Sequence, residues 1–303
     1  MAQTGRRLLL TYLGPMAIGV GLISLFPILY NVYISFTNQN LYHFRNYSIV
    51  GFVNYGKLFS GLNADFFIVL GRTFLFVAIC IPLFLIVGML AAMALNHPSV
   101  KFKAFWRVAL IIPWAVPSYV TALVWKFFYN GDFGTFNQVY RLFAGPQAGL
   151  PWLTDPTWAF GSIVLTNIWM SYPFFMVVIL GALQSIPSEL YEAAAVDGAS
   201  GWSKFWRITL PLLRPAILPA TILSAILTFN VLNTAYLITQ GGPFISANKP
   251  GATEFVLVYA FRNAFQLFNY SYIAAFAVVI FFLLFAVTLG SLRFTGLVRE
   301  EGR

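Results

Sequence analysis

The chain has 303 residues, of which 59% are hydrophobic and only 9% are charged. Soluble domains carry about 25% charged residues, so a soluble core cannot account for this much apolar surface. The net charge of +9 does not require a nucleic-acid partner, because membrane proteins keep Lys and Arg in their cytoplasmic loops. We therefore expect an all-α protein that contacts membrane lipid and binds no nucleic acid.

Cysteine and histidine are too few and too scattered for a metal centre or a disulfide framework. The single cysteine, Cys80, lies in an apolar run, and His43 and His97 fall in loops that are far apart in the sequence. One cysteine cannot form an internal disulfide, and these residues show no metal-binding spacing. The sequence predicts no metal site and a buried, inert Cys80.

Long apolar runs predict six transmembrane helices, since a helix needs about 20 residues to cross the hydrocarbon. The first run follows Arg6 and Arg7 and is too long for a cleaved secretory signal, so we interpret it as an uncleaved span. The segment 252–268 is predicted to be a short surface or re-entrant helix, or the start of a long last span. A single polytopic transmembrane domain, 1–303, follows. The six predicted spans cover residues 8–36, 73–95, 108–125, 158–183, 215–238 and 271–292.

The distribution of basic residues predicts the orientation of these spans. Six spans place both termini on one side, together with the loops 96–107 and 184–214. That side carries 11 of the 18 Lys and Arg residues in less loop length, and the other side carries 7. Positive charge is concentrated in cytoplasmic loops, so both termini are predicted to be cytoplasmic.

The sequence contains no signature of an enzyme or of a nucleotide-binding site. It has no G-x-x-x-x-G-K-[ST] loop, no G-x-S-x-G elbow and no H-E-x-x-H helix. Arg72 and Lys126 lie at the edges of predicted spans, and no ionisable residue is expected deep within one. Proton- and sodium-coupled carriers often place such residues in the membrane, although neutral oxygens can also bind sodium. We expect a non-catalytic translocation pathway without a cofactor.

The polar loop between the fourth and fifth predicted spans, 184–214, has a pattern that predicts two short helices. Ser188 is a plausible N-cap, and Glu189 and Glu192 follow in the first turns, where negative charge complements the helix dipole. Three alanines at 193–195 favour helix, and Gly198 stands where a helix would stop. Pro211 is expected to close the unit before the next span. The second helix has one largely apolar face made by Trp202, Phe205, Trp206 and Thr209.

This loop resembles the EAA motif of ABC importer permeases. That motif is E-A-A, three residues, G, nine residues and I-x-L-P. Residues 192–194 read E-A-A, Gly198 follows after three residues, and 208–211 read I-T-L-P after nine more. Every fixed position and both gaps match.

Other segments resemble the carbohydrate-importer branch of these permeases. Residues 52–55 read F-V-N-Y, which is similar to its F-x-N-Y element. Residues 241–243 (G-G-P) and 259–265 (Y-A-F-R-N-A-F) resemble the subunit type of the maltose transporter's F chain. The resemblance covers most of the chain and identifies a suspected permease of a binding-protein-dependent sugar importer.

The resemblance implies a type I ABC importer permease fold in the bacterial cytoplasmic membrane. It implies that the chain forms half of a sugar pathway with a second homologous permease similar to the maltose transporter's G chain. Two ATPase subunits would hold the ATP and magnesium, and an extracytoplasmic sugar-binding protein would deliver the sugar. Glu192 would anchor the cytoplasmic loop 184–214 to an ATPase, and Gly198 would allow its bend. The residues predicted to couple to the ATPase are Glu192, Ala193, Ala194, Asp197, Gly198, Ile208, Leu210 and Pro211.

Polar and aromatic side chains in the fourth and fifth spans are candidates for the substrate pathway. Ser224, Thr228 and Val231 are spaced to share one helix face. The alternative is that such polar residues only join helices by hydrogen bonds. A permease for another solute and a stand-alone carrier or membrane enzyme are the competing functions, and maltose, maltodextrin and trehalose fit the pattern equally. The predicted pathway residues are Ser171, Phe174, Ser224, Thr228, Asn230 and Asn233.

Overall fold

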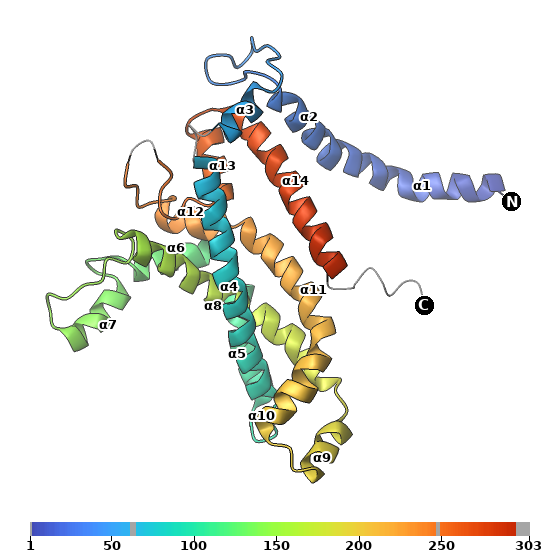
Figure 1. Ribbon diagram of the computed structural model, residues 1–303, viewed down its shortest axis with the longest axis vertical. Helices are drawn as coiled ribbons and strands as arrows, with labels where there is room; N and C mark the ends of the chain where they lie inside the picture. The colour runs from blue at the N-terminus through green and yellow to red at the C-terminus, as the bar shows by residue number, and fades with distance from the viewer. Residues whose placement is uncertain (1, 61–64, 247–248, 295–303) are drawn as a thin grey trace. The chain divides into compact units, whose positions relative to one another are not determined.

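The computed structural model describes residues 2–60, 65–246 and 249–294, and their regular secondary structure is helical. The all-α prediction is confirmed. The chain divides into two compact units, Met1–Phe66 with Ala260–Leu289 (unit 1) and Phe67–Tyr259 with Gly290–Arg303 (unit 2). The elements, of which Figure 1 labels the α-helices, are α1 (Ala2–Val20), the π-helical turn η1 (Gly21–Leu25), α2 (Phe26–Ser35), α3 (Val53–Phe59), α4 (Asp65–Asn96), α5 (Lys103–Ala115), α6 (Ser118–Phe128), α7 (Thr135–Ala144), α8 (Pro156–Gln184), α9 (Ser188–Val196), α10 (Gly201–Lys204), the π-helical turn η2 (Phe205–Thr209), α11 (Leu210–Phe229), α12 (Asn233–Thr239), α13 (Val256–Phe265) and α14 (Tyr270–Phe294).

Among the described residues, five helical stretches are long and apolar enough to cross a membrane, and six if one bent pair counts as a span. The number agrees with the six-span prediction if that bent pair is one span, and two spans differ from the prediction in shape. The five stretches are Thr11–Ser35, Asp65–Asn96, Pro156–Gln184, Gly201–Thr239 and Tyr270–Ser291.

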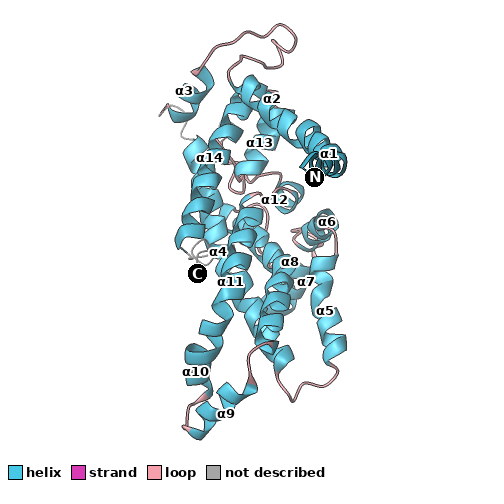
Figure 2. Ribbon diagram, turned by 90° about the vertical axis from the view of Figure 1, so that its right-hand side faces the viewer, coloured by secondary structure: helices cyan, strands magenta, loops and turns pink. Residues whose placement is uncertain are grey.

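The predicted third span, 108–125, is wrong as a single helix. It consists of α5 and α6, which meet at 90° (Figure 2). Val116 is extended, with φ −76° and ψ 131°, and Pro117 follows it. A residue that precedes proline is disfavoured in the α region, so the chain turns at this position.

The predicted fifth span, 215–238, begins earlier than expected, at Gly201, and its helix is interrupted between Phe229 and Asn233. A continuous helix runs from Gly201 through η2 to Phe229, so the prediction that Pro211 closes a separate unit is wrong. In η2 the Leu210 N–H donates to the Phe205 carbonyl, and Pro211 comes next. The π-helical turn thus precedes the residue that has no N–H to donate, and the helix continues across it.

The first span contains the same arrangement. In η1 the Phe26 N–H donates to the Gly21 carbonyl, and Pro27 is the following residue. A π-helical turn before proline therefore occurs in both units. Because such turns bend a helix without breaking its backbone bonding, Pro27 and Pro211 are accommodated inside continuous helices.

The core of unit 2 forms where α4 and α8 approach closely. A Cβ built on Gly88 of α4 would lie 2.6 Å from the Phe175 Cβ and 2.8 Å from the Tyr172 carbonyl oxygen of α8. Because glycine has no side chain, it allows the backbones of α4 and α8 to come this close. Cys80 is fully buried in this core, as expected. Its fully buried members include Phe76, Cys80, Phe84, Ile163, Phe175, Met176, Ile179 and Leu213.

In unit 1 the F-x-N-Y element secures the end of α2. The Asn54 Nδ2 donates to the carbonyl oxygens of Ser35 (2.9 Å) and Thr37 (2.7 Å). The Tyr55 hydroxyl lies 2.7 Å from the Ser35 Oγ. A helix end leaves its last carbonyls unsatisfied, so these bonds give the element a structural role.

The connection between α12 and α13 folds around the half-buried Arg72 and the buried Glu254 in unit 2. The Arg72 guanidinium donates to the carbonyl oxygens of Pro250 (3.0 Å) and Gly251, and it attracts Glu254. Glu254 is fully buried and accepts a bond from the Gly251 N–H at 2.9 Å. Since α4 begins at Asp65, Arg72 lies within the first turns of this 32-residue helix.

The segment 252–268 contains α13, which is separate from the last span. It ends at Phe265, and α14 begins at Tyr270. The alternative of one long last span is therefore wrong. Phe255, just before α13, packs on Phe76 with ring centroids 4.5 Å apart, and the Val256 N–H donates to the Thr73 Oγ1 at 3.0 Å. These contacts attach the start of α13 to α4.

We predict that Gly88→Ala lowers the free energy of unfolding by about 1–3 kcal/mol, because the added methyl group collides with the α8 backbone. The control is Gly71→Ala in the same helix, where nothing lies within 4 Å of the added carbon. Heating the purified chain with a thiol-reactive dye reports unfolding through the buried Cys80. Equal midpoints for the two variants would contradict the proposed close contact.

We also predict that Arg72→Met destabilises the chain, because it leaves the Glu254 carboxylate buried without its cation. Breaking a buried pair costs about 3–5 kcal/mol, and the partial exposure of Arg72 places the expected loss near the lower end. Adding Glu254→Gln removes the isolated charge and restores part of the stability. If the second substitution had no effect in the same thermal assay, the pair would not be the cause.

Candidate translocation pocket and coupling helix

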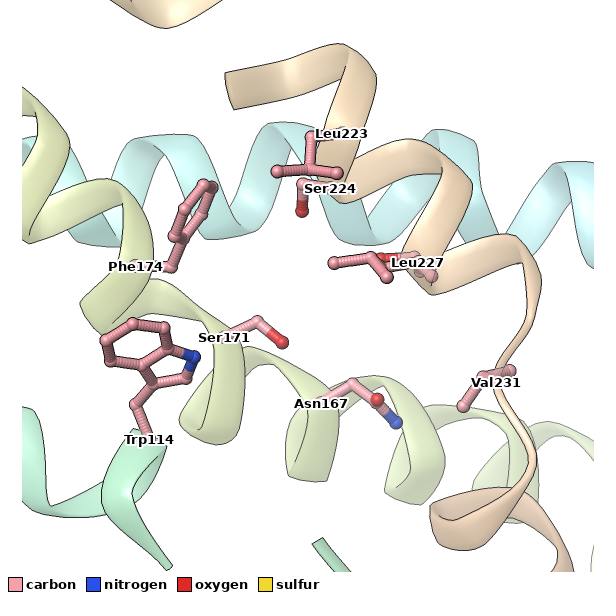
Figure 3. Close-up of a pocket in the computed structure, with 9 residues that line it drawn as sticks. Trp114, Asn167, Ser171, Phe174, Leu223, Ser224, Leu227 and Val231 are labelled. Carbon is pink, nitrogen blue, oxygen red and sulfur yellow. The ribbon is translucent and has the colours of Figure 1, made fainter. Parts of the chain in front are cut away.

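A pocket of about 300 Å³ lies between α8 and α11 in unit 2, with one wall from the end of α5. Figure 3 shows the side chains of α8 and α11 facing each other across it. Four of the six predicted pathway residues, Ser171, Phe174, Ser224 and Thr228, line this pocket. The full lining is Trp114, Asn167, Ser171, Phe174, Leu223, Ser224, Leu227, Thr228 and Val231.

Helical spacing explains how these side chains come together. On α8, Asn167, Ser171 and Phe174 stand at i, i+4 and i+7 and therefore share a face. On the opposite side Ser224 and Thr228 share a face of α11, and Val231 continues it just beyond the helix end. The predicted face of the fifth span is thus the one that lines the pocket.

Three hydroxyl groups in the pocket are open to a ligand. Among the described residues, the side-chain oxygens of Ser171, Ser224 and Thr228 have no hydrogen-bond partner. Ser224 and Thr228 are nevertheless buried, with only 7% and 9% of their surface exposed. Since buried polar groups cost free energy when they are unpaired, these hydroxyls favour a ligand that can bond to them.

Asn167 fits the alternative role of joining helices. Its Nδ2 donates to the Ile163 carbonyl at 2.8 Å and to the Thr234 Oγ1 at 3.1 Å. Its amide is therefore already used to hold α8 to α12. In the pocket lining, the Asn167 amide therefore joins two helices, whereas the three hydroxyl groups remain available to bind a ligand.

An aromatic wall completes the pocket. The rings of Trp114 and Phe174 lie 6.2 Å apart between centroids. Sequence reasoning missed Trp114, because a continuous third span gave no reason to place it beside the fourth. The bend at Pro117 ends α5 just after this residue. The lining contains no ionisable side chain, and the described residues hold no cluster of His, Cys, Asp or Glu suited to a metal.

Asn230 and Asn233, which were also predicted for the pathway, do not line the pocket. α11 ends at Phe229, so these residues lie at the break before α12 and at its first turn. The Asn230 Nδ2 donates to the Ile226 carbonyl of its own helix at 2.9 Å. The Asn233 Nδ2 donates to the Ser118 Oγ at 2.8 Å, which joins α12 to α6.

The EAA segment forms α9 and a sharp turn into the helix that starts at Gly201. Gly198 has φ +75°, its N–H donates to the Ala195 carbonyl at 3.0 Å, and the Ala199 N–H donates to the Ala194 carbonyl at 2.9 Å. This pair of bonds is a Schellman motif, so Gly198 ends the helix as predicted. The Ser188 N-cap prediction is wrong, because Pro187 holds that position without a side-chain cap.

The predicted coupling residues divide into an exposed group and a partly buried group. Glu192, Ala193 and Asp197 are exposed on or just after α9, and neighbouring Val196 is 88% exposed. Ala194 is half-buried, and Ile208, Leu210 and Pro211 are half-buried in the following helix. α9 therefore presents a small-residue, acidic surface, while the I-x-L-P part belongs to the helix that leads to the pocket.

The chain matches characterised families along most of its length. The family described as binding-protein-dependent transport system inner membrane component matches residues 84–298. The galactooligosaccharides transport system permease protein GanP of Bacillus subtilis (strain 168) is 34% identical over 91% of this chain and 67% of its own length. The maltose/maltodextrin transport system permease protein MalF of Klebsiella aerogenes is 34% identical over 81% of this chain.

The chain spans about half the length of that MalF, 49% of it. It spans 90% of the sulfoquinovosyl glycerol transport system permease protein SmoG of Agrobacterium fabrum (strain C58), which is 35% identical over 95% of this chain.

A solved structure has the same fold. A chain of a bacterial alginate ABC transporter, in complex with an alginate pentasaccharide-bound periplasmic protein, superposes with a TM-score of 0.79. It is 20% identical and covers 98% of this chain and 97% of its own length. The predicted type I ABC importer permease fold is thereby confirmed. This chain belongs to the family of binding-protein-dependent transport system inner membrane components, as its EAA pattern predicted.

Proposed function

We propose that this chain is the permease subunit of an ATP-driven importer of neutral oligosaccharides. The pocket between α8 and α11 carries the proposal, because it combines three available hydroxyls with the rings of Trp114 and Phe174 and no charged side chain. Sugars present hydroxyl groups and apolar ring faces, which suit this combination of groups. Relatives named for galactooligosaccharides and maltodextrin support the same substrate class.

The chain itself is proposed to be non-catalytic. Its sequence has no phosphate-binding loop, so ATP and magnesium would be held by two partner ATPase subunits. The exposed acidic surface around Glu192 is the proposed docking site for one of them. All predicted coupling residues lie on α9, its terminal turn or the first turns of the following helix.

A second homologous permease, similar to the maltose transporter's G chain, and an extracytoplasmic sugar-binding protein complete the proposed assembly. Helix Thr11–Ser35 supports a need for neighbours, because its side chains are mostly exposed. Membrane lipid or the second permease would cover this surface. We place both termini and α9 on the cytoplasmic side of the bacterial inner membrane, on the strength of the basic-residue distribution.

The continuous helix from Gly201 to Phe229 suggests how ATP hydrolysis would reach the pocket. Its first turns follow the EAA bend, and its last turns carry Ser224 and Thr228. A displacement of α9 by the ATPase would therefore reposition one wall of the pocket against α8. Nucleotide and loaded binding protein would then favour different states of the same pathway.

Purification of the complex through a tag on this chain tests the proposal. We expect ATPase subunits to co-purify and proteoliposomes to take up labelled maltodextrin only when ATP is supplied. Unlabelled neutral oligosaccharides should compete for uptake, and a charged phosphodiester should not. Uptake by the chain alone, without any ATPase, would identify a stand-alone carrier and contradict the proposal.

We predict that Glu192→Ala lowers either the amount of co-purified ATPase or the uptake per ATP hydrolysed by at least about fivefold. The reason is that the substitution removes the exposed acidic side chain through which α9 is proposed to dock. Gly198→Asp should act similarly, because it places a negative charge just after the C-terminal end of α9, where the helix dipole disfavours it. Asp132→Ala, which removes an exposed acidic side chain outside α9, is the matched control. Normal sugar-stimulated ATP turnover in the first two variants would argue against docking through α9.

We predict that Ser224→Leu blocks uptake while the complex still assembles, because the larger side chain fills the pocket from α11. Ser224→Ala removes only the hydroxyl and should weaken the apparent affinity for sugar by about fivefold, the value of one neutral hydrogen bond. Thr228→Ser keeps a hydroxyl and should transport normally. Unchanged uptake in Ser224→Leu would remove this pocket from the pathway.

A further inference from the structure

We propose that the hydrogen bond between Tyr191 and Thr209 makes α9 move as one body with the helix that lines the pocket. The Tyr191 hydroxyl lies 2.9 Å from the Thr209 Oγ1, across the bend that separates α9 from the following helix. Both residues lie in unit 2. This inference rests on the proposed function, in which an ATPase subunit pushes or pulls α9.

Both partners of the bond occupy defined positions. Thr209 is 6% exposed and ends the π-helical turn η2, where its Oγ1 lies 3.4 Å from the Lys204 carbonyl oxygen. If the Thr209 hydroxyl donates to this carbonyl, its oxygen remains available to accept from the Tyr191 O–H. The two bonds then tie α9 to the one turn of the long helix that departs from α-helical geometry.

α9 has few other attachments. Within the part of the chain that the structure describes, this is the one side-chain hydrogen bond between α9 and another helix. A pocket of about 620 Å³, lined by Met93, His97, Leu183, Ile186 and others, separates α9 from the ends of α4 and α8. Tyr191 and Thr209 themselves lie on the wall of this pocket. Figures 1 and 2 both place α9 at one end of unit 2, beside α10.

The mechanical consequence follows from this arrangement. A force on α9 can reach the next helix through the chain at 197–200 or through the Tyr191–Thr209 contact. At this turn nothing lies within 4 Å of a potential side chain on Gly198, so no neighbouring side chain packs against that position. The hydrogen bond adds a second attachment between α9 and the following helix, beside the one made by the chain itself. Ser224 lies 15 residues beyond Thr209, about 22 Å along the same helix at about 1.5 Å per residue.

Tyr191 and Thr209 are therefore positioning residues that act through α11 without touching the substrate. Removing one neutral hydrogen bond changes a coupled equilibrium by about fivefold. We expect Tyr191→Phe and Thr209→Val each to lower solute uptake per ATP hydrolysed by about fivefold in the reconstituted complex. ATPase co-purification should stay unchanged, because the docking surface of α9 is intact.

The double variant and the conservative variant separate positioning from a merely structural effect. Tyr191→Phe combined with Thr209→Val should lose no more than either single change, since both remove the same bond. Thr209→Ser keeps the hydroxyl, so its uptake per ATP hydrolysed should equal that of the wild type. Tyr119→Phe, the same chemical change at an exposed site on α6, should leave uptake per ATP unaltered. Unchanged coupling in both single variants, or effects that multiply in the double variant, would overturn the inference.

A distance measurement tests the contact without the transport assay. Spin labels at Val196→Cys and Leu212→Cys, which are 88% and 47% exposed, report the separation of α9 from α11. Tyr191→Phe should broaden this distance distribution, and an unchanged width would count against the contact. If no ATPase co-purified with the wild-type chain, the proposed function would fail, but the spin-label widths would still decide whether Tyr191 and Thr209 hold α9.

Discussion

The packing of α8 against its neighbours in unit 2 is the constraint on which the candidate site depends. α8 contacts α4 at Gly88, where the absence of a side chain allows the close approach. It faces α11 across the pocket. A bulky residue at position 88 would push α8 aside and change the distance between Ser171 and Ser224. The glycine is therefore a determinant of the pocket, although it lies on a helix that contributes no lining residue.

Proline determines where these helices bend and where they stop. At Pro27 and Pro211 a preceding π-helical turn keeps the helix continuous, whereas at Pro117 the chain turns by 90°. The difference lies in the backbone before the proline, since Val116 is extended while Phe26 and Leu210 are helical. Proline is therefore compatible with the long helix between the EAA bend and the pocket. At Pro117 it instead accompanies the bend that sets Trp114 beside Phe174.

The sequence elements that resemble other importers have different physical roles. Asn54 of the F-x-N-Y element satisfies carbonyls at the end of α2, which is a task of the fold. Gly241, with φ +87°, belongs to the connection that closes over Arg72 and Glu254. In the EAA segment, Glu192 and Ala193 are exposed on a sparsely attached helix. That exposure is what supports docking there, whereas the other elements explain stability.

Local sequence determined the features that depend on neighbours in the chain. Apolar runs located the spans, the position of Gly198 predicted the end of α9, and spacing put Ser224 and Thr228 on one face. These predictions succeeded because helix periodicity and termination are set within a few residues. Tertiary structure alone decided that Asn230 and Asn233 leave the pocket, that Trp114 enters it, and that Tyr191 meets Thr209. Those outcomes depend on where a helix bends and which helix packs beside it, and that information is distributed over residues far apart in the sequence.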